Sequence, residues 1–116
     1  MEDGAEAWFR RQTSHWRDWP LERLMRWKRS SDTHISVVIP ARNEQATVGG
    51  IVDAVAHAFM REHRLVDELA VMDSDSTDGT AEAAARAGAT VYWCRDVVPS
   101  LGAHPGKGEA LWKSLN

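Results

Sequence analysis

Short apolar runs alternate with stretches of helical periodicity between residues 35 and 116. The run Ile-Ser-Val-Val-Ile-Pro at 35–40 is rich in β-branched residues and predicts a strand buried on both faces of a parallel sheet. We expect the hydrogen-bond ladder to end at Pro40, because proline has no backbone N–H. The runs at 67–73 and 90–94 predict two further strands.

Helical patterns fill the segments between these runs. Apolar residues recur at intervals of three and four over 48–59, which predicts a helix with one apolar face. An alanine-rich helix is expected over 80–87, ended by Gly88, and a last helix from about Gly108. The order β-α-β-α-β-loop-α with short connections predicts an α/β fold with a parallel sheet.

Residues 1–33 differ from the rest of the chain, because they hold four of its six tryptophans. Pro20 suits the first position of a helix, and Leu21, Leu24 and Met25 follow as an apolar stripe. We therefore expect a helix over about 20–29. The predicted domain division is an N-terminal helical extension at 1–33 and an α/β part at 34–116.

Composition limits which binding partners and which cellular compartment the sequence predicts. The chain has 116 residues, 43% of them apolar, which suits one domain or part of one. The net charge of −3 disfavours a nucleic-acid or anionic-membrane surface. Cys94 is the only cysteine, and no apolar run approaches the ~20 residues of a membrane span. We expect a cytoplasmic protein with no nucleic-acid or membrane partner.

A polar cluster follows each predicted strand. The clusters are Arg-Asn-Glu at 42–44, Asp-Ser-Asp at 73–75 and Pro-Gly-Lys-Gly-Glu at 105–109. Ligands of open α/β sheets bind at the carboxyl edge of the strands, so all three clusters should meet there. Lys107 lies between glycines and can approach a diphosphate as a point charge. The sequence therefore predicts a nucleotide site.

Other readings of the same residues stay open. Glu44 or Asn43 can equally cap the helix that follows, Ser74 can be a turn residue, and Lys107 can be solvated. Asp78 suits the N-cap of the next helix better than a ligand role. The chain has neither a Gly-x-Gly-x-x-Gly after the first strand nor a Walker loop, which disfavours dinucleotide oxidoreductases and P-loop enzymes.

Three segments carry a resemblance to a known family. Val-Ile-Pro-Ala-Arg-Asn-Glu at 38–44 and Val-Met-Asp-Ser-Asp-Ser-Thr-Asp-Gly-Thr at 71–80 resemble the start of a family 2 glycosyltransferase with the GT-A fold. The segment Pro-Gly-Lys-Gly-Glu-Ala-Leu-Trp-Lys-Ser-Leu at 105–115 narrows the resemblance to the glucosyl-3-phosphoglycerate synthases. The implied fold is a Rossmann-like, nucleotide-sugar-binding half of GT-A with a three-stranded parallel core at 34–116.

The resemblance also implies an activity and a site. Members of this family transfer glucose from UDP-glucose to 3-phosphoglycerate with retention of configuration. Ser74 would contact the uracil region and Lys107 the diphosphate. Five consecutive residues would hold the uridine: Pro40, Ala41, Arg42, Asn43 and Glu44. The resemblance assigns no catalytic residue within this chain.

Two departures from the family limit what is expected of the chain alone. Asp75 stands where the family usually has glycine, and it adds charge near the nucleotide. The family's Asp-x-Asp element, which holds Mg²⁺, and its acceptor half are missing from these 116 residues. We expect a donor-side fragment without activity of its own, from a family in which a homodimer is implied.

Two alternative functions remain at this point. One is a related family 2 transferase that uses a polyprenyl-phosphate acceptor, because the first motif is common to many such enzymes. The other is a non-catalytic remnant that only binds a nucleotide or a partner subunit.

Overall fold

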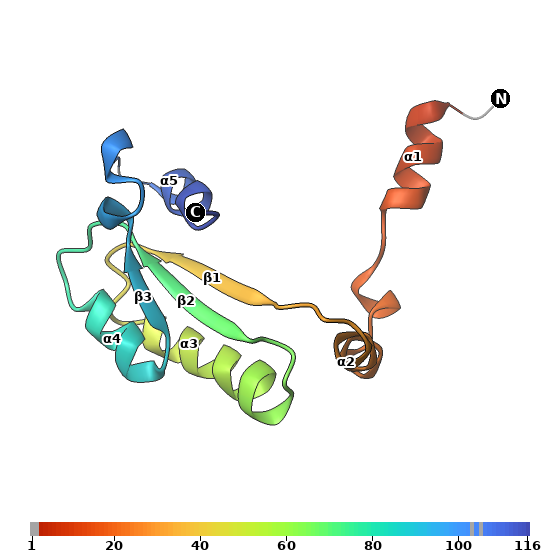
Figure 1. Cartoon of the computed structure of the whole chain (residues 1–116), viewed down its shortest axis with the longest axis horizontal. Coiled ribbons are helices and arrows are strands. Elements are labelled where there is room, and N and C mark those ends of the chain that lie inside the picture. Colours follow the sequence, from red (N-terminus) through yellow and green to blue (C-terminus); the bar gives the residue numbers. More distant parts are fainter. Residues whose placement is uncertain (1–2, 103, 105) are drawn as a thin grey trace. The chain divides into compact units, whose positions relative to one another are not determined.

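The computed structural model describes residues 3–102, 104 and 106–116. The chain divides into two compact units, Met1–Asp32 and Thr33–Asn116, and each is described by itself. Figure 1 shows the elements of both units with their labels. The proposed division into an extension and a donor-binding part stays a prediction.

The first unit contains two helices and a short 3₁₀ turn. Helix α1 (Gly4–Gln12) was not expected from the sequence, and it begins where the side chain of Asp3 accepts a hydrogen bond from the Ala5 amide at 3.3 Å. Helix α2 (Leu21–Ser30) lies where the apolar stripe predicts it, but Pro20 is its N-cap and not its first helical residue. The unit has no fully buried residue among those described.

The second unit is built on a three-stranded parallel sheet in the order β1-β2-β3. The strands are β1 (Ser36–Ala41), β2 (Glu68–Asp73) and β3 (Thr90–Trp93). Both pairings are parallel, with Ile39 opposite Val71 and Val71 opposite Val91. The α/β class and the parallel core predicted from the sequence are confirmed.

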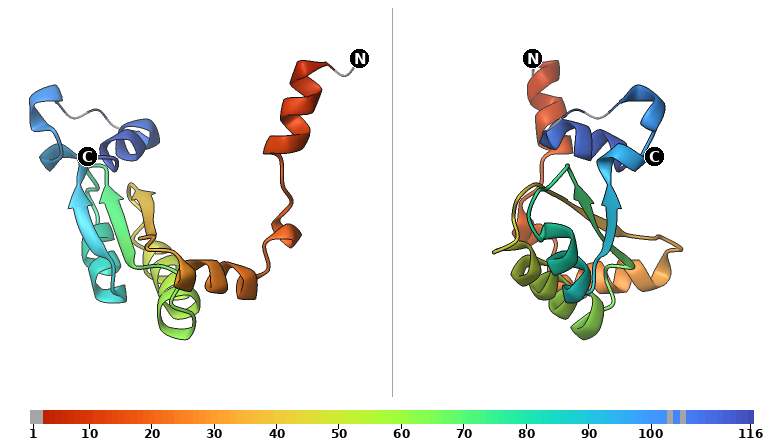
Figure 2. Two further views of the ribbon diagram at one scale, coloured as in Figure 1. Left: turned by 45° about the vertical axis from the view of Figure 1, so that its right-hand side comes forward. Right: turned by 90° about the vertical axis from the view of Figure 1, so that its left-hand side faces the viewer.

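Helices cover the two faces of the sheet. Helices α3 (Val48–Ala56) and α4 (Thr80–Ala87) lie on one face, and α5 (Lys107–Lys113) lies on the other (Figure 2). A π-helical turn, His57–Glu62, continues α3. Gly88 ends α4 with a left-handed φ of 111°, as the sequence predicts.

Alternate residues of the strands supply two separate cores. Leu69 and Val71 of β2 face α3 and α4, where they pack with Val48, Val52 and Ala84. Met72, the neighbour of Val71, packs on the opposite face with Cys94 and Ala110. The period of two along β2 therefore places a larger core beneath α3 and α4 and a smaller one beneath α5.

Two expectations for the first strand are wrong. Strand β1 is mostly half-buried, and β2 is the strand that is buried almost throughout. The ladder also continues past Pro40, since Pro40 pairs with Met72 and Ala41 with Asp73. The physical reason is the strand order: β1 is an edge strand of the described sheet, where a missing N–H removes no hydrogen bond from the ladder.

Candidate functional site

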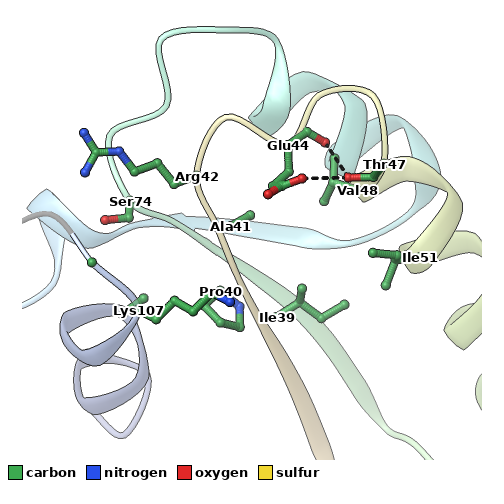
Figure 3. A pocket seen from close by; sticks show the side chains of 12 residues that line it. Ile39, Pro40, Ala41, Arg42, Glu44, Thr47, Val48, Ile51, Ser74 and Lys107 are labelled. Atoms are coloured by element: carbon green, nitrogen blue, oxygen red, sulfur yellow. Dashed lines mark hydrogen bonds between the residues drawn. The ribbon is translucent and has the colours of Figure 1, made fainter.

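A pocket of about 440 Å³ opens at the carboxyl ends of β1 and β2. Figure 3 shows that its wall combines the end of β1, the β1–α3 loop, the residue after β2 and the start of α5. Twelve residues line it: Ile39, Pro40, Ala41, Arg42, Glu44, Thr47, Val48, Ile51, Ser74, Gly106, Lys107 and Ala110. The three polar clusters of the sequence therefore contribute to one cavity. Pro105, in the third cluster, lies outside the described residues.

Glu44 enters the pocket from the β1–α3 loop and is held there by hydrogen bonds within that loop. Its carboxylate Oε2 accepts a hydrogen bond from the Thr47 hydroxyl at 2.9 Å (Figure 3). Its backbone carbonyl accepts the amides of Thr47 and Val48, at 3.1 and 2.9 Å. The Glu44 side chain does not cap α3. Among the described residues no hydrogen bond to its other carboxylate oxygen is recorded, and that oxygen can accept one from a ligand.

The Asn43 side chain makes contacts within the protein, whereas its neighbours Arg42 and Glu44 line the pocket. Its Oδ1 accepts hydrogen bonds from the amide of Thr77 at 2.8 Å and from the Thr77 hydroxyl at 3.3 Å. The Asn43 amide donates to Ser76 Oγ at 2.9 Å, with Asn43 at a left-handed φ of 51°. Asn43 is not among the residues that line the pocket, and it locks the β1–α3 loop to the β2–α4 turn.

A second set of hydrogen bonds joins the same two segments. The buried hydroxyl of Thr80 accepts from the Glu44 amide at 2.9 Å and donates to Asp78. Asp78 also accepts from the Thr80 amide at 3.0 Å, as expected of a residue that caps α4, although Gly79 is the N-cap by backbone geometry. The Thr80 hydroxyl is the first cause that holds the pKa of Asp78 below its usual value.

The turn after β2 places Ser74 at the pocket. Ser74 is buried, and its amide donates to the Ala41 carbonyl at 2.9 Å, which extends the strand pairing by one residue. Asp75 follows with a left-handed φ of 52° and an exposed side chain. Aspartate tolerates this conformation better than most non-glycine residues, so Asp75 fits the turn.

Lys107 reaches the pocket from the first turn of α5. Figure 3 shows its side chain extending from α5 toward Pro40 of β1. Arg42 lies on the same rim, beside Ser74. Arg42, Gly106 and Lys107 all line the pocket, and cationic side chains and a glycine backbone are groups suited to phosphate oxygens.

The other candidate sites are weak within the described part of the chain. No group of three or more His, Cys, Asp and Glu residues there is placed to hold a metal ion. Cys94 is buried and packs with Met72 and Ala110, and that burial is the first cause that raises the pKa of its thiol, which disfavours the reactive thiolate form. None of the helices in the described ranges has both the length and the apolar character that crossing a membrane would require.

Sequence comparison decides the family. A profile described as glycosyl transferase family 2 matches residues 36–109, well over half of the chain. The chain belongs to glycosyl transferase family 2. The matched range holds all three strands and every residue lining the pocket except Ala110.

The curated relatives narrow the resemblance. The chain is 39% identical over 95 residues to the glucosyl-3-phosphoglycerate synthase of Petrotoga mobilis. The matched region covers 82% of this chain and 29% of the relative. It is 47% identical over 81 residues to the Mycobacterium tuberculosis enzyme of that name, covering 70% of this chain and 24% of the relative. The chain thus spans about a quarter of the length of these relatives.

Solved structures agree with the fold. The mannosyl-3-phosphoglycerate synthase of Rubrobacter xylanophilus matches with a TM-score of 0.83 and 41% identity, covering 94% of this chain and 34% of that one. The M. tuberculosis glucosyl-3-phosphoglycerate synthase in complex with Mn²⁺, UDP-glucose and glycerol 3-phosphate matches with a TM-score of 0.71 and 42% identity, covering 84% of this chain and 33% of that one. The similarity to glucosyl-3-phosphoglycerate synthases with the GT-A fold is confirmed, and a divalent metal belongs to the family's chemistry.

Proposed function

We propose that the pocket binds the UDP part of UDP-glucose and that the chain forms the donor side of a hexosyltransferase. The observation that carries this proposal is the meeting of Glu44, Ser74 and Lys107 in one cavity although they follow different strands. The uridine lies against Pro40, Ala41, Arg42 and Glu44, the four residues of the first motif that line the pocket. In this arrangement Asn43 acts by shaping the loop through Thr77.

Each polar residue then has a definite role. Glu44 accepts a hydrogen bond from a nucleoside hydroxyl or N–H group with the carboxylate oxygen that Thr47 does not use. Ser74 contacts the uracil region, and Lys107 contacts the diphosphate. A cation at the diphosphate stabilises the negative charge that develops on UDP as its bond to the sugar breaks. The described residues offer no ligand set of three or more His, Cys, Asp and Glu side chains for a divalent metal.

The acceptor side rests on the relatives. Glucosyl-3-phosphoglycerate synthases among the curated relatives and a structure with phosphoglyceric acid support 3-phosphoglycerate as the acceptor. A homodimer as the functional assembly is part of the same proposal and follows from the family resemblance of the sequence alone. The second candidate donor is a mannose nucleotide, because a mannosyl-3-phosphoglycerate synthase is among the similar structures.

Calorimetry with the 116-residue chain tests the donor proposal. UDP-glucose should bind with the affinity of UDP or better, and GDP-mannose should bind more weakly. Lys107→Ala should cost UDP on the order of 1.5–3 kcal/mol, the range for hydrogen bonds to charged groups, and leave uridine unchanged. Glu44→Ala should weaken both ligands. Lys28→Ala, on α2, is the matched control and should change neither.

The outcomes separate the alternatives. Equal losses for UDP and uridine on Lys107→Ala would remove the phosphate role of Lys107. Tighter binding of GDP-mannose than of UDP-glucose would favour the mannosyl donor. A chain that binds none of these nucleotides while folded would reject the donor site itself.

A further inference from the structure

The most unusual buried group of the second unit is a lysine that does not line the pocket. Lys113 is 1% exposed, and it ends the short helix α5 whose first residue is Lys107. Burial of an ammonium group is unfavourable unless its charge and its three donors are satisfied. The surroundings of Lys113 meet both requirements.

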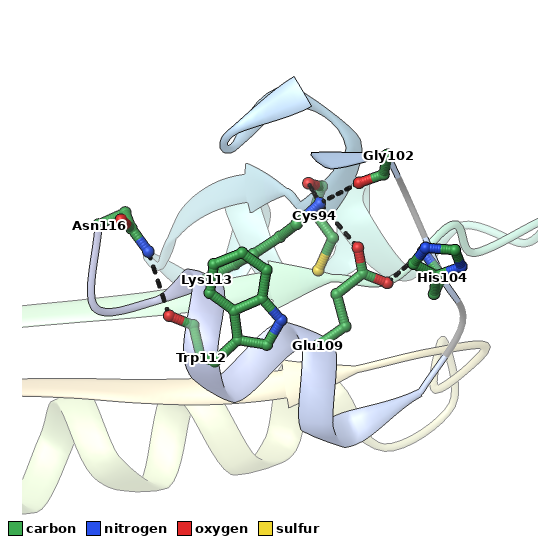
Figure 4. Close-up of polar contacts among 7 residues, drawn as sticks. All are labelled: Cys94, Gly102, His104, Glu109, Trp112, Lys113 and Asn116. Atoms are coloured by element: carbon green, nitrogen blue, oxygen red, sulfur yellow. Dashed lines mark hydrogen bonds and ion pairs between the residues drawn. The ribbon is translucent and has the colours of Figure 1, made fainter. Parts of the chain in front are cut away.

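Three oxygens surround the ammonium group of Lys113 (Figure 4). Lys113 Nζ donates to the carbonyl of Cys94 at 2.7 Å and to the carbonyl of Gly102 at 2.9 Å, and it lies 2.7 Å from Glu109 Oε1. The Lys113 side chain is fully buried and that of Glu109 is 8% exposed. The segment that follows β3 is thereby fastened to α5 at two separate carbonyls.

Glu109 extends this network to His104, in the segment before α5. Its other oxygen accepts a hydrogen bond from the His104 amide. The contact with the Lys113 side chain is the first cause that holds the pKa of Glu109 below its usual value, which favours the carboxylate form of Glu109. One ion pair therefore joins the residue after β3, Gly102, His104 and both ends of α5.

Helix α5 depends on such contacts for its position. It has seven residues, and its N-cap is Gly106, which has no side chain to make a capping hydrogen bond. A helix this short is not stable by itself, so tertiary contacts must set where its first turn lies. Two contacts do so from inside the protein, namely the buried methyl group of Ala110 and the buried ammonium of Lys113.

We infer that Lys113 is a positioning residue for the phosphate side of the pocket: through Glu109 and the carbonyls of Cys94 and Gly102 it fixes α5 so that Lys107 faces the diphosphate. This rests on the proposed nucleotide site and adds to it a buried residue that touches no ligand. The rival explanation is that Ala110 alone holds α5 and that Lys113 contributes only to stability.

A double-mutant cycle separates the two explanations. UDP and uridine affinities are measured by calorimetry for the wild type, Lys113→Met, Lys107→Ala and the double variant. Lys113→Met keeps the apolar stem and should weaken UDP about tenfold, by loss of a well-placed charged contact, while uridine stays within about twofold. In the Lys107→Ala background the same change should have no further effect on UDP. Lys28→Met, the same substitution on α2, is the control.

Every outcome decides something. Equal losses for UDP and uridine, or a Lys113→Met effect that adds fully to that of Lys107→Ala, would overturn the positioning role. If Lys113→Met shows no cooperative unfolding, Glu109→Gln takes its place under the same criteria. A wild-type chain that binds no UDP would reject the proposed function. A UDP loss on Lys107→Ala with none on Lys113→Met or Glu109→Gln would reject only this inference.

Discussion

The two walls of the pocket are held in place by different physics. The loop wall consists of residues 42–47 and 74–80, and its hydrogen bonds join turn residues that are mostly exposed. The helix wall consists of the described residues of 94–113, and a buried ion pair organises it. Each wall supplies part of the ligand contacts, Glu44 and Ser74 from one and Lys107 from the other.

This difference determines how each wall responds to change. The loop wall is stabilised by several hydrogen bonds, each contributing about 0.5–1.5 kcal/mol, so the loss of any one of them leaves most of the stabilisation in place. The helix wall depends on one charge, and removing one member of a buried pair leaves the other uncompensated. We therefore expect one substitution in the ion pair to cost the helix wall most of its stabilisation, and one substitution in the loop wall to cost only a part.

The largest expected effect is on the helix wall. Lys113→Ala should lower the free energy of unfolding by about 3–5 kcal/mol, because it leaves Glu109 beside empty space and frees two carbonyls. Urea titration of the 116-residue chain measures this loss. Lys107→Ala, on the exposed first turn of the same helix, should stay within about 0.5 kcal/mol of the wild type. A loss on Lys113→Ala no larger than that of the control would contradict the dominance of the ion pair.

The next effect tests a hydrogen bond of the loop wall that is made by the buried hydroxyl of Thr80. Thr80→Val keeps the shape of the side chain but removes the hydroxyl that accepts the Glu44 amide. Stability should fall by about 1–3 kcal/mol, the cost of an unpaired buried donor. Hydrogen exchange at the Glu44 amide should also become faster. Thr90→Val, at an exposed position of β3, is the matched control, and a similar loss there would show that the hydroxyl of Thr80 is not the cause.

A smaller effect concerns ligand binding at the loop wall. Thr47→Val removes the hydroxyl that orients the Glu44 carboxylate, without changing a buried contact. Uridine affinity should fall about two- to fivefold, and stability should stay within about 0.5 kcal/mol, because the hydrogen bond is exposed. Calorimetry with uridine and a urea titration measure the two quantities. Thr47→Ser keeps the hydroxyl and should bind as the wild type does; a loss in Thr47→Ser as large as that in Thr47→Val would refute the orienting role.

The sequence predicts the loop wall better than the helix wall, and the reason is local. Strong short-range signals mark β2, α4 and Gly88: an apolar run, an alanine-rich period and a glycine at the helix end. They also placed Glu44, Ser74 and Lys107 at the right edge of the sheet, since parallel strands share a carboxyl edge. Donor contacts by these residues remain a prediction.

Features that depend on distant contacts were missed. The continuation of β1 past Pro40 follows from its edge position, which the run of residues 35–40 does not encode. Nothing in the local sequence marks Lys113 as buried, because its three acceptors come from residues up to 19 positions away. A spacing of four between Glu109 and Lys113 was the one available signal, and it is common on exposed helices.

The smallest expected effect is the dependence of the stability of each wall on pH. Asp78 on the loop wall and Glu109 on the helix wall both have a lowered pKa in the folded protein. The ordinary pKa from which each is lowered is 3.8 for Asp78 and 4.5 for Glu109. A group whose pKa is lowered by folding stabilises the protein above the unfolded value, and that stability is lost as the pH falls through the folded value. The loss at the helix wall should therefore begin at a higher pH than the loss at the loop wall. Urea midpoints measured from about pH 6 down to about pH 2 should fall less steeply in Asp78→Asn below 3.8, and less steeply in Glu109→Gln from 4.5 downward. An acid slope in either variant equal to that of the wild type would show that the carboxylate it lacks is not what acid titrates in that wall.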